Sequence, residues 1–276
     1  MGIIESIKKG FGVASGSMGL VLALFVFGFI WNLINVFAFK NSENPSTSQA
    51  IVMIVTAVAF ILFTIFMQAG SLGYVRDRVK SGTATLSSFA SSGGKYYWRV
   101  LLIGLIVGAV AAVFILLASL ALALLGKGPQ QAAAVAGEAA ATGNPVLSAL
   151  AIALAATLVI AGVYFILLMF LAPYIAIIEE RKAIESIKKS VSTVKANFLR
   201  ILGLFGLLIV IGFVFGLAVG LLFALVNLAT KGGTVSDVIF AALSSLVNSY
   251  LGLVVTGAFM SFYLGLSSQS NNTVGA

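Results

Sequence analysis

The six-residue sequence IESIKK occurs twice, at Ile4–Lys9 and at Ile184–Lys189, and each copy precedes a long apolar run. Apolar residues of the two segments correspond at a constant offset of 180 residues and recur at helical spacing, with the charged residues on the other face. The pattern predicts a duplicated basic amphipathic helix at a membrane surface, leading into a membrane span. The duplication indicates a protein built from internal repeats and does not identify a reaction.

The apolar runs account for an unusual composition. The 276 residues are 61% hydrophobic and only 9% charged, whereas soluble domains carry about 25% charged residues. Six runs without charge each exceed the roughly 20 residues that cross a bilayer. We therefore predict an all-α, polytopic membrane protein with six transmembrane helices. The expected cores are Gly19–Phe39, Ala50–Tyr74, Trp98–Leu125, Val146–Ala172, Phe198–Ala229 and Val238–Leu266.

The six spans are expected to form three repeated hairpins in a single transmembrane domain, each preceded by a basic interfacial helix. In the middle unit this helix is a weaker copy, which Ser91–Gly94 should shorten or break. The small polar residues 267–276 are expected to form a disordered tail. The hairpin units cover approximately residues 2–80, 81–178 and 179–266.

The distribution of basic residues predicts the orientation. Thirteen of the sixteen Lys and Arg flank the side with both termini, which gives that side a net charge of +8 and the other side zero. The positive-inside rule then places both termini in the cytoplasm of a multi-pass cell-membrane protein. Because orientation and attraction to anionic lipid headgroups explain the basic charge, we expect no nucleic-acid partner.

The two amphipathic helices carry the lysines expected at the lipid surface. Glu5 and Lys9, and likewise Glu185 and Lys189, are expected to pair along their helices. The functional interpretation is recognition of anionic lipid or docking of a membrane or cytosolic protein. The alternative is an elbow that fixes the angle of the next span. The expected lipid-surface residues are Lys8, Lys9, Lys188, Lys189 and Lys195.

Small and polar residues within the spans suggest contacts between helices. Gly212, Gly216 and Gly220 recur every fourth residue, which allows close packing inside the bundle or, alternatively, a homodimer seam. Asn248 and Ser249 are candidate pathway contacts, with hydrogen bonding between helices as the alternative. No Asp, Glu, Lys or Arg lies deep in a predicted span, which argues against an ion-coupled transporter.

The search for catalytic chemistry is negative. The chain has no Cys and no His, which excludes thiol nucleophiles, imidazole bases and most transition-metal sites, and it has no phosphate-binding loop motif. Glu179 and Glu180 are expected to pair with nearby Lys and Arg. We therefore expect no enzyme activity, no cofactor and no metal.

Several short segments resemble known membrane families. They include Gly70–Tyr74, Gly94–Arg99, Ala172–Tyr174 and Ile178–Ser190. The chain resembles six-helix integral membrane families of unknown function, and is similar to the membrane domain fused to some glycerophosphodiester phosphodiesterases. The resemblance spans nearly the whole chain and implies membrane residence and three hairpins. It supplies no catalytic residue, because in the fused proteins the chemistry belongs to a separate soluble domain.

These observations favour a non-enzymatic integral membrane protein that serves as an accessory, scaffold or lipid-interacting subunit. The alternative is a permease or flippase-like transporter of a small neutral or lipidic molecule, with Asn248 and Ser249 near the route. An intramembrane enzyme is a third class, and the acidic residues outside the spans would have to supply its chemistry.

Overall fold

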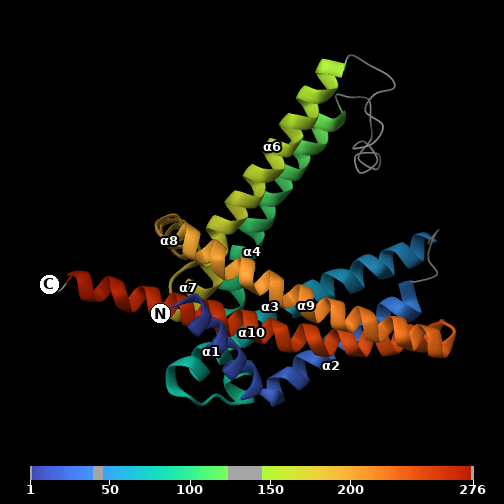
Figure 1. Ribbon diagram of the computed structural model, residues 1–276, viewed down its shortest axis with the longest axis horizontal. Helices are drawn as coiled ribbons and strands as arrows, with labels where there is room; N and C mark the ends of the chain where they lie inside the picture. The colour runs from blue at the N-terminus through green and yellow to red at the C-terminus, as the bar shows by residue number, and fades with distance from the viewer. Residues whose placement is uncertain (1, 40–45, 124–144, 275–276) are drawn as a thin grey trace.

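The computed structural model describes residues 2–39, 46–123 and 145–274, and these form helices with no strand among them (Figure 1). Lys40 and Lys127, which we assigned to the side opposite the termini, lie outside these ranges. The helices are α1 Ile3–Ser15, α2 Met18–Ile34, the π-helix η1 Asn35–Phe39, α3 Thr47–Ser81, α4 Leu86–Ala123, α6 Pro145–Met169, α7 Ala172–Ile178, α8 Ala183–Ala196, α9 Phe198–Thr230 and α10 Thr234–Val274.

Within the described residues, six helices are long and apolar enough to cross a membrane, which agrees with the predicted all-α fold and its six spans. Large apolar side chains on them point outward, such as Leu228 (78% exposed) and Ile160 (70% exposed). So much exposed apolar surface is compatible with lipid and not with water. The segments are Met18–Phe37, Thr47–Ser81, Leu86–Ala121, Ile152–Ile178, Phe198–Thr230 and Thr234–Ser268.

The helices form two arms that meet at one end of the molecule. Helices α4 and α6 project together as one arm, while α2, α3, α9 and α10 extend together as the other (Figure 1). The junction holds α1, α7 and α8, and both termini lie on this side. Contacts are not confined to neighbours in sequence, since both α1 and α2 pack on α10.

Close packing between α3 and α4 explains why the predicted break in the middle unit is wrong. Helix α4 runs unbroken through Ser91–Gly94. A Cβ added at Gly73 would lie 2.2 Å from the Ser92 side chain, and one added at Gly93 would lie 2.7 Å from Phe66. The small residues therefore allow the two helix backbones to approach each other, and do not end the helix.

The end of the chain also differs from the expectation. Helix α10 runs to Val274, so most of the predicted disordered tail 267–276 is helical. The segment after Gly265 contains no glycine or proline up to Val274. In addition, the Ser267 and Ser268 hydroxyls donate to the carbonyls three residues earlier. Nothing in this segment stops the helix, although its residues are small and polar.

Helices α1 and α8 occur where the amphipathic pattern predicted helices, but their most protected positions are small residues facing protein. Ser6 and Ser186 are both fully buried, whereas Ile4 and Ile184 are 66% and 62% exposed. Helix α1 packs closely on α10, since a Cβ at Gly10 would lie 2.4 Å from a backbone oxygen of α10. These two isoleucines are therefore the apolar side chains left for contact with lipid.

The fourth span is interrupted just before its end. Helix α6 stops at Met169 and α7 restarts at Ala172, with Pro173 in its first turn, where the missing N–H of proline costs no helical hydrogen bond. The break turns the chain toward α8. The Ser190 hydroxyl donates to the Leu168 carbonyl at 2.7 Å and so satisfies one of the carbonyls freed by the break.

Candidate functional site

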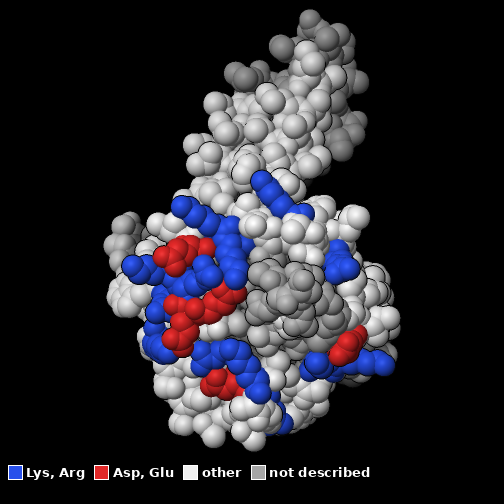
Figure 2. Space-filling model, turned by 90° about the vertical axis from the view of Figure 1, so that its left-hand side faces the viewer, with Lys and Arg blue, Asp and Glu red and all other residues white. Residues whose placement is uncertain are grey.

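Charged side chains gather where the two arms meet. We call this region, which comprises α1, α7, α8 and the adjoining ends of α3, α4 and α10, the charged end. Figure 2 shows Lys and Arg interleaved with Asp and Glu on this face, while the projecting arm is uncharged. The thirteen basic residues that we assigned to one side of the spans belong to these elements, to the turn between α7 and α8 and to the first turn of α9.

Glu180 connects three elements of the charged end. It follows α7 in a left-handed backbone conformation, with φ of 55°. Its Oε1 accepts hydrogen bonds from Lys95 Nζ at 2.6 Å and from the Tyr96 hydroxyl at 2.7 Å, both on α4. Arg99 donates to its carbonyl at 2.8 Å, and Arg76 of α3 lies 3.6 Å from its carboxylate. These bonds hold the turn between α7 and α8 against α4.

Glu179 connects a different set of helices. Its carboxylate accepts hydrogen bonds from Lys189 of α8 at 2.7 Å, from Arg181 at 2.6 Å and from the Tyr263 hydroxyl of α10. Only 19% of the Glu179 side chain is exposed. The two adjacent glutamates therefore pair with Lys and Arg, as we predicted, and their partners lie on different helices.

Both carboxylates are held in their ionised form. Burial tends to raise the pKa of Glu179, but the hydrogen bonds from Lys189, Tyr263 and Arg181 outweigh it and lower the pKa. The hydrogen bonds from Lys95 and Tyr96 lower the pKa of Glu180 to about 2. Carboxylates stabilised as anions by several donors make poor general bases at neutral pH.

The lysines expected at the lipid surface are on this end, with one difference. Lys8, Lys9, Lys188 and Lys195 are exposed. Lys9 lies 3.5 Å from Glu5, as predicted. The second predicted pair is wrong, because Lys189 binds Glu179 and not Glu185. The break before α7 brings the Glu179 carboxylate over α8, which spacing along one helix could not reveal.

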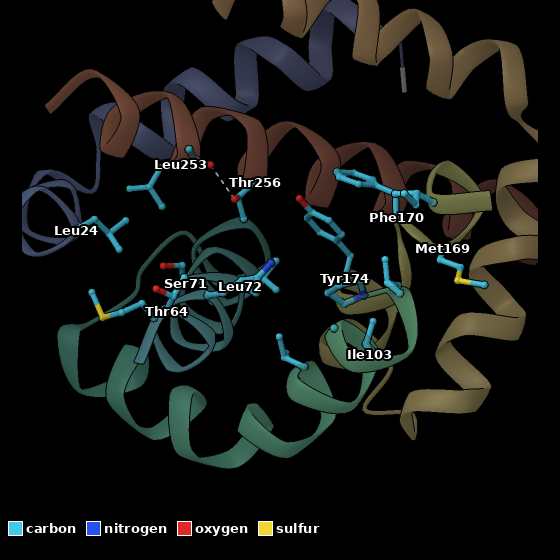
Figure 3. A pocket seen from close by; sticks show the side chains of 18 of the residues that line it. Leu24, Thr64, Ser71, Leu72, Ile103, Met169, Phe170, Tyr174, Leu253 and Thr256 are labelled. Atoms are coloured by element: carbon cyan, nitrogen blue, oxygen red, sulfur yellow. Dashed lines mark hydrogen bonds between the residues drawn. The ribbon is translucent and has the colours of Figure 1, made fainter. Parts of the chain in front are cut away.

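A cavity of about 570 Å³ lies between the two arms, beside α7. Figure 3 shows Thr64, Ser71 and Leu72 of α3 on one wall, Leu253 and Thr256 of α10 across from them, and Tyr174 with Ile103 beyond. Its volume falls within the range of about 300–1,000 Å³ that is typical of ligand sites. Further apolar lining comes from Leu24, Phe27, Met67, Val100, Val107, Ile166, Met169 and Phe170.

Three polar residues form a stripe on the α3 wall of this cavity. Thr64, Gln68 and Ser71 follow one another at spacings of four and three residues, and so share a helix face. Ser71 is only 8% exposed, yet its hydroxyl has no hydrogen-bond partner among the described residues. By contrast, the Thr157 and Ser249 hydroxyls within other spans donate to the carbonyl four residues earlier.

The glycine stripe and Asn248 lie together, but away from the central cavity. Gly212, Gly216 and Gly220 line a groove of about 270 Å³ between α9 and α10, with Asn248 on its other wall. A Cβ at any of these glycines would meet nothing within 4 Å. The close backbone contact that the spacing suggested is therefore formed by Gly10, Gly70 and Gly73 instead. Ser249 does not line this groove, and its hydroxyl bonds to Ser245 O.

Sequence reasoning missed the cavity. The available signal was the helical spacing of Thr64, Gln68 and Ser71. Their common face was recognisable, but the other walls come from α2, α4, α6, α7 and α10, which are far apart in sequence. Among the described residues, no group of His, Cys, Asp and Glu could hold a metal ion.

Comparison with known proteins gives a family and no activity. No curated protein and no solved structure matches the chain. None of the comparisons links it to the membrane domains fused to glycerophosphodiester phosphodiesterases. One family matches residues 1–266, which is nearly the entire length. The chain therefore belongs to the family described as Domain of unknown function (DUF7847).

Proposed function

We propose that this protein is a non-enzymatic, multi-pass protein of the cell membrane that binds anionic lipid headgroups through its charged end. It acts as an accessory or scaffold subunit, with both termini in the cytoplasm and with three duplicated hairpins. The observation that carries the proposal is the gathering of basic residues on one end of an otherwise apolar bundle (Figure 2). Such an end attracts anionic lipids at about 1 kcal/mol per basic residue near the surface.

The geometry of α1 and α8 supports contact with lipid at this end. Each helix buries a small-residue face against the bundle and leaves an isoleucine, Ile4 or Ile184, exposed beside lysines. An exposed apolar side chain next to ammonium groups suits the boundary between acyl chains and phosphates. The matching burial of Ser6 and Ser186 also supports a duplicated unit.

The state of the acidic residues supports a role without catalysis. Glu179 and Glu180 are engaged in ion pairs that connect helices, so they stabilise the junction of the two arms. No nucleic-acid partner is proposed, because attraction to anionic lipid accounts for the basic charge.

The test is lipid retention measured by native mass spectrometry. The wild-type protein should retain phosphatidylglycerol in preference to phosphatidylcholine. The triple variant Lys8→Gln, Lys188→Gln and Lys195→Gln should bind phosphatidylglycerol at least about tenfold more weakly, since each lysine contributes about 1 kcal/mol before screening. Lys189 is left unchanged because it pairs with Glu179.

Lys231→Gln is the matched control, because Lys231 is an exposed lysine in the turn between α9 and α10, at the opposite end of the arm. This variant should retain phosphatidylglycerol as the wild type does. Equal retention of the two lipids by the wild type, or an equal loss in the control and the triple variant, would reject the proposal.

The cavity favours a second candidate, a carrier for a small neutral or lipidic molecule. Its polar stripe lies within the spans and its lining contains no charged residue. A carrier would move a fluorescent neutral lipid between the leaflets of protein-containing vesicles faster than in protein-free vesicles. A binding or scaffold protein would leave that rate unchanged, so this assay separates the two functions.

A further inference from the structure

We infer that the central cavity is a binding site for a neutral single-chain amphiphile, in which a hydrocarbon chain carries an uncharged head with hydroxyl and ester groups, as in a monoacylglycerol. The inference rests on membrane residence but not on the binding of anionic lipid at the charged end. The central cavity is separate from the lysines of the charged end, because none of its lining residues is charged.

The unpartnered polar groups on the α3 wall indicate that something else satisfies them. A buried hydroxyl without a hydrogen bond is unfavourable in an apolar environment. Serine in a helix can donate to the carbonyl four residues earlier, but Ser71 does not, and its side chain lies on the cavity wall (Figure 3). Gln68, one turn earlier, is exposed and lines the same cavity, where its amide can both donate and accept hydrogen bonds.

The charge of the lining determines the class of head group. None of the residues that line the cavity is Asp, Glu, Lys or Arg. A carboxylate, phosphate or ammonium placed there would be desolvated without a counter-ion, which is strongly unfavourable. Hydroxyl and ester groups can instead bond to Gln68 and Ser71 at little cost in desolvation.

The depth and shape of the cavity determine the rest of the ligand. Gln68 precedes Arg76 of the charged end by eight residues, or about 12 Å along the helix. The head would therefore lie below the lipid phosphates, within the apolar part of the spans. Phe27, Val107 and Met169 provide apolar walls for a chain, and flexible methionine side chains adapt to such ligands.

Two glycines allow the cavity to be filled without a clash. Gly104 of α4 and Gly252 of α10 both line it, and a Cβ at either position would meet nothing within 4 Å. Leucine at either position would occupy the space of the ligand. Gly108 lies one turn beyond Gly104 on the same helix, is equally free of neighbours, and does not line the cavity. Gly108→Leu is therefore the matched control.

The experiment is photolabelling in phosphatidylcholine nanodiscs. The probe is a monoacylglycerol with a diazirine in its chain, and the comparison probe is the fatty acid with the same chain, ionised at about pH 8. Labelled peptides are mapped by mass spectrometry. The monoacylglycerol should label the cavity walls on α3, α4 and α10, and the fatty acid should label them at least about tenfold less because its carboxylate has no counter-ion there.

Labelling of cavity variants distinguishes binding in this cavity from non-specific labelling. Gly104→Leu and Gly252→Leu should each reduce labelling of the α3 wall at least about tenfold by occupying the cavity. Gly108→Leu should leave it unchanged. Gln68→Leu combined with Ser71→Ala should reduce monoacylglycerol labelling about tenfold, which is the effect expected for two lost hydrogen bonds. An unchanged unfolding midpoint in detergent shows that each variant is folded.

Equal labelling of the wild type and both cavity-filling variants would overturn the inference, and so would equal labelling by the fatty acid. The nanodiscs contain no anionic lipid, so the result is independent of the lysines at the charged end. Loss of phosphatidylglycerol selectivity would reject the proposed function and leave the cavity site standing. Failure to label the cavity would reject the cavity site and leave the proposed binding of anionic lipid standing.

Discussion

At the scale of single residues, a few polar side chains connect helices that are distant in sequence. Ion pairs between exposed groups, such as Lys95 with Glu180, contribute little to stability because water screens them. The more protected contacts contribute more, because the alternative is a buried polar group without a partner. Glu179 and Ser190 are of this second kind, since Glu179 is largely buried and Ser190 is fully buried.

The hydrogen bonds to the Glu180 carboxylate make the stability of the folded protein depend on pH. The pKa of Glu180 is lowered from 4.5 to about 2 in the folded protein, so its contribution is fully present above about pH 4.5 and is lost as pH falls toward 2. Glu180→Gln should therefore unfold at a lower temperature than the wild type at neutral pH. The difference in unfolding midpoint, measured in detergent, should shrink over that pH range.

Glu185→Gln serves as the control for this pH series, because Glu185 is exposed on α8 and has no ion-pair partner among the described residues. It should change the midpoint little at any pH. A difference between wild type and Glu180→Gln that persists undiminished to about pH 2 would contradict the assignment of Lys95 and Tyr96 as the cause of the lowered pKa.

Ser190 should show the cost of an unsatisfied carbonyl at the break in the fourth span. Ser190→Ala removes the donor to Leu168 O and should lower the free energy of unfolding by about 1–3 kcal/mol. Ser192→Ala, at an exposed position on the same helix, should change it by less than about 0.5 kcal/mol. Equal effects of the two substitutions on denaturant unfolding would show that the hydrogen bond does not stabilise the junction.

At the scale of helices, small residues determine which pairs pack closely. Helix α1 crosses α10 at Gly10, where an added Cβ would lie 2.4 Å from Val254 O. Gly10→Ala should therefore displace α1 from α10 and destabilise the protein by about 1–3 kcal/mol, the usual cost of overpacking. Hydrogen exchange should show reduced protection throughout α1.

Gly12, two residues away on the same helix, provides the comparison for Gly10. A Cβ there would meet nothing within 4 Å, so Gly12→Ala should be neutral or stabilising by about 0.5–1 kcal/mol through helix propensity. If both alanine variants keep α1 equally protected, close packing at Gly10 is not what holds α1 in place.

The glycines also show what sequence could and could not predict about the elements. Spacing alone singled out Gly212, Gly216 and Gly220, yet these line an open groove, while Gly73 packs tightly against Ser92 and Gly93 against Phe66. A glycine stripe shows that close approach is allowed, but the facing helix decides whether it occurs. The same limit applies to Ser91–Gly94, where packing on α3 keeps α4 helical despite weak local propensity.

For the molecule as a whole, composition was enough to predict the fold class, whereas it predicted no functional site. Charge-free runs suffice to predict six apolar helices, because hydrocarbon tolerates few other structures. The division into two arms depends on contacts such as α2 with α10, which local patterns do not encode. The central cavity follows from that arrangement, since its lining comes from six helices, α2, α3, α4, α6, α7 and α10. Only its polar stripe on α3 was visible in the sequence.

We propose that the charged end faces the cytoplasm and that the apolar helices extend from it across the membrane. The chain contains no cysteine, so single cysteines can be introduced without background. Lys188→Cys on α8 and Val235→Cys at the start of α10 are both exposed and lie at opposite ends of the arm. A membrane-impermeant maleimide should label Val235→Cys in intact cells and Lys188→Cys only in inside-out vesicles. The reverse pattern, or labelling of both positions from the same side, would contradict the account.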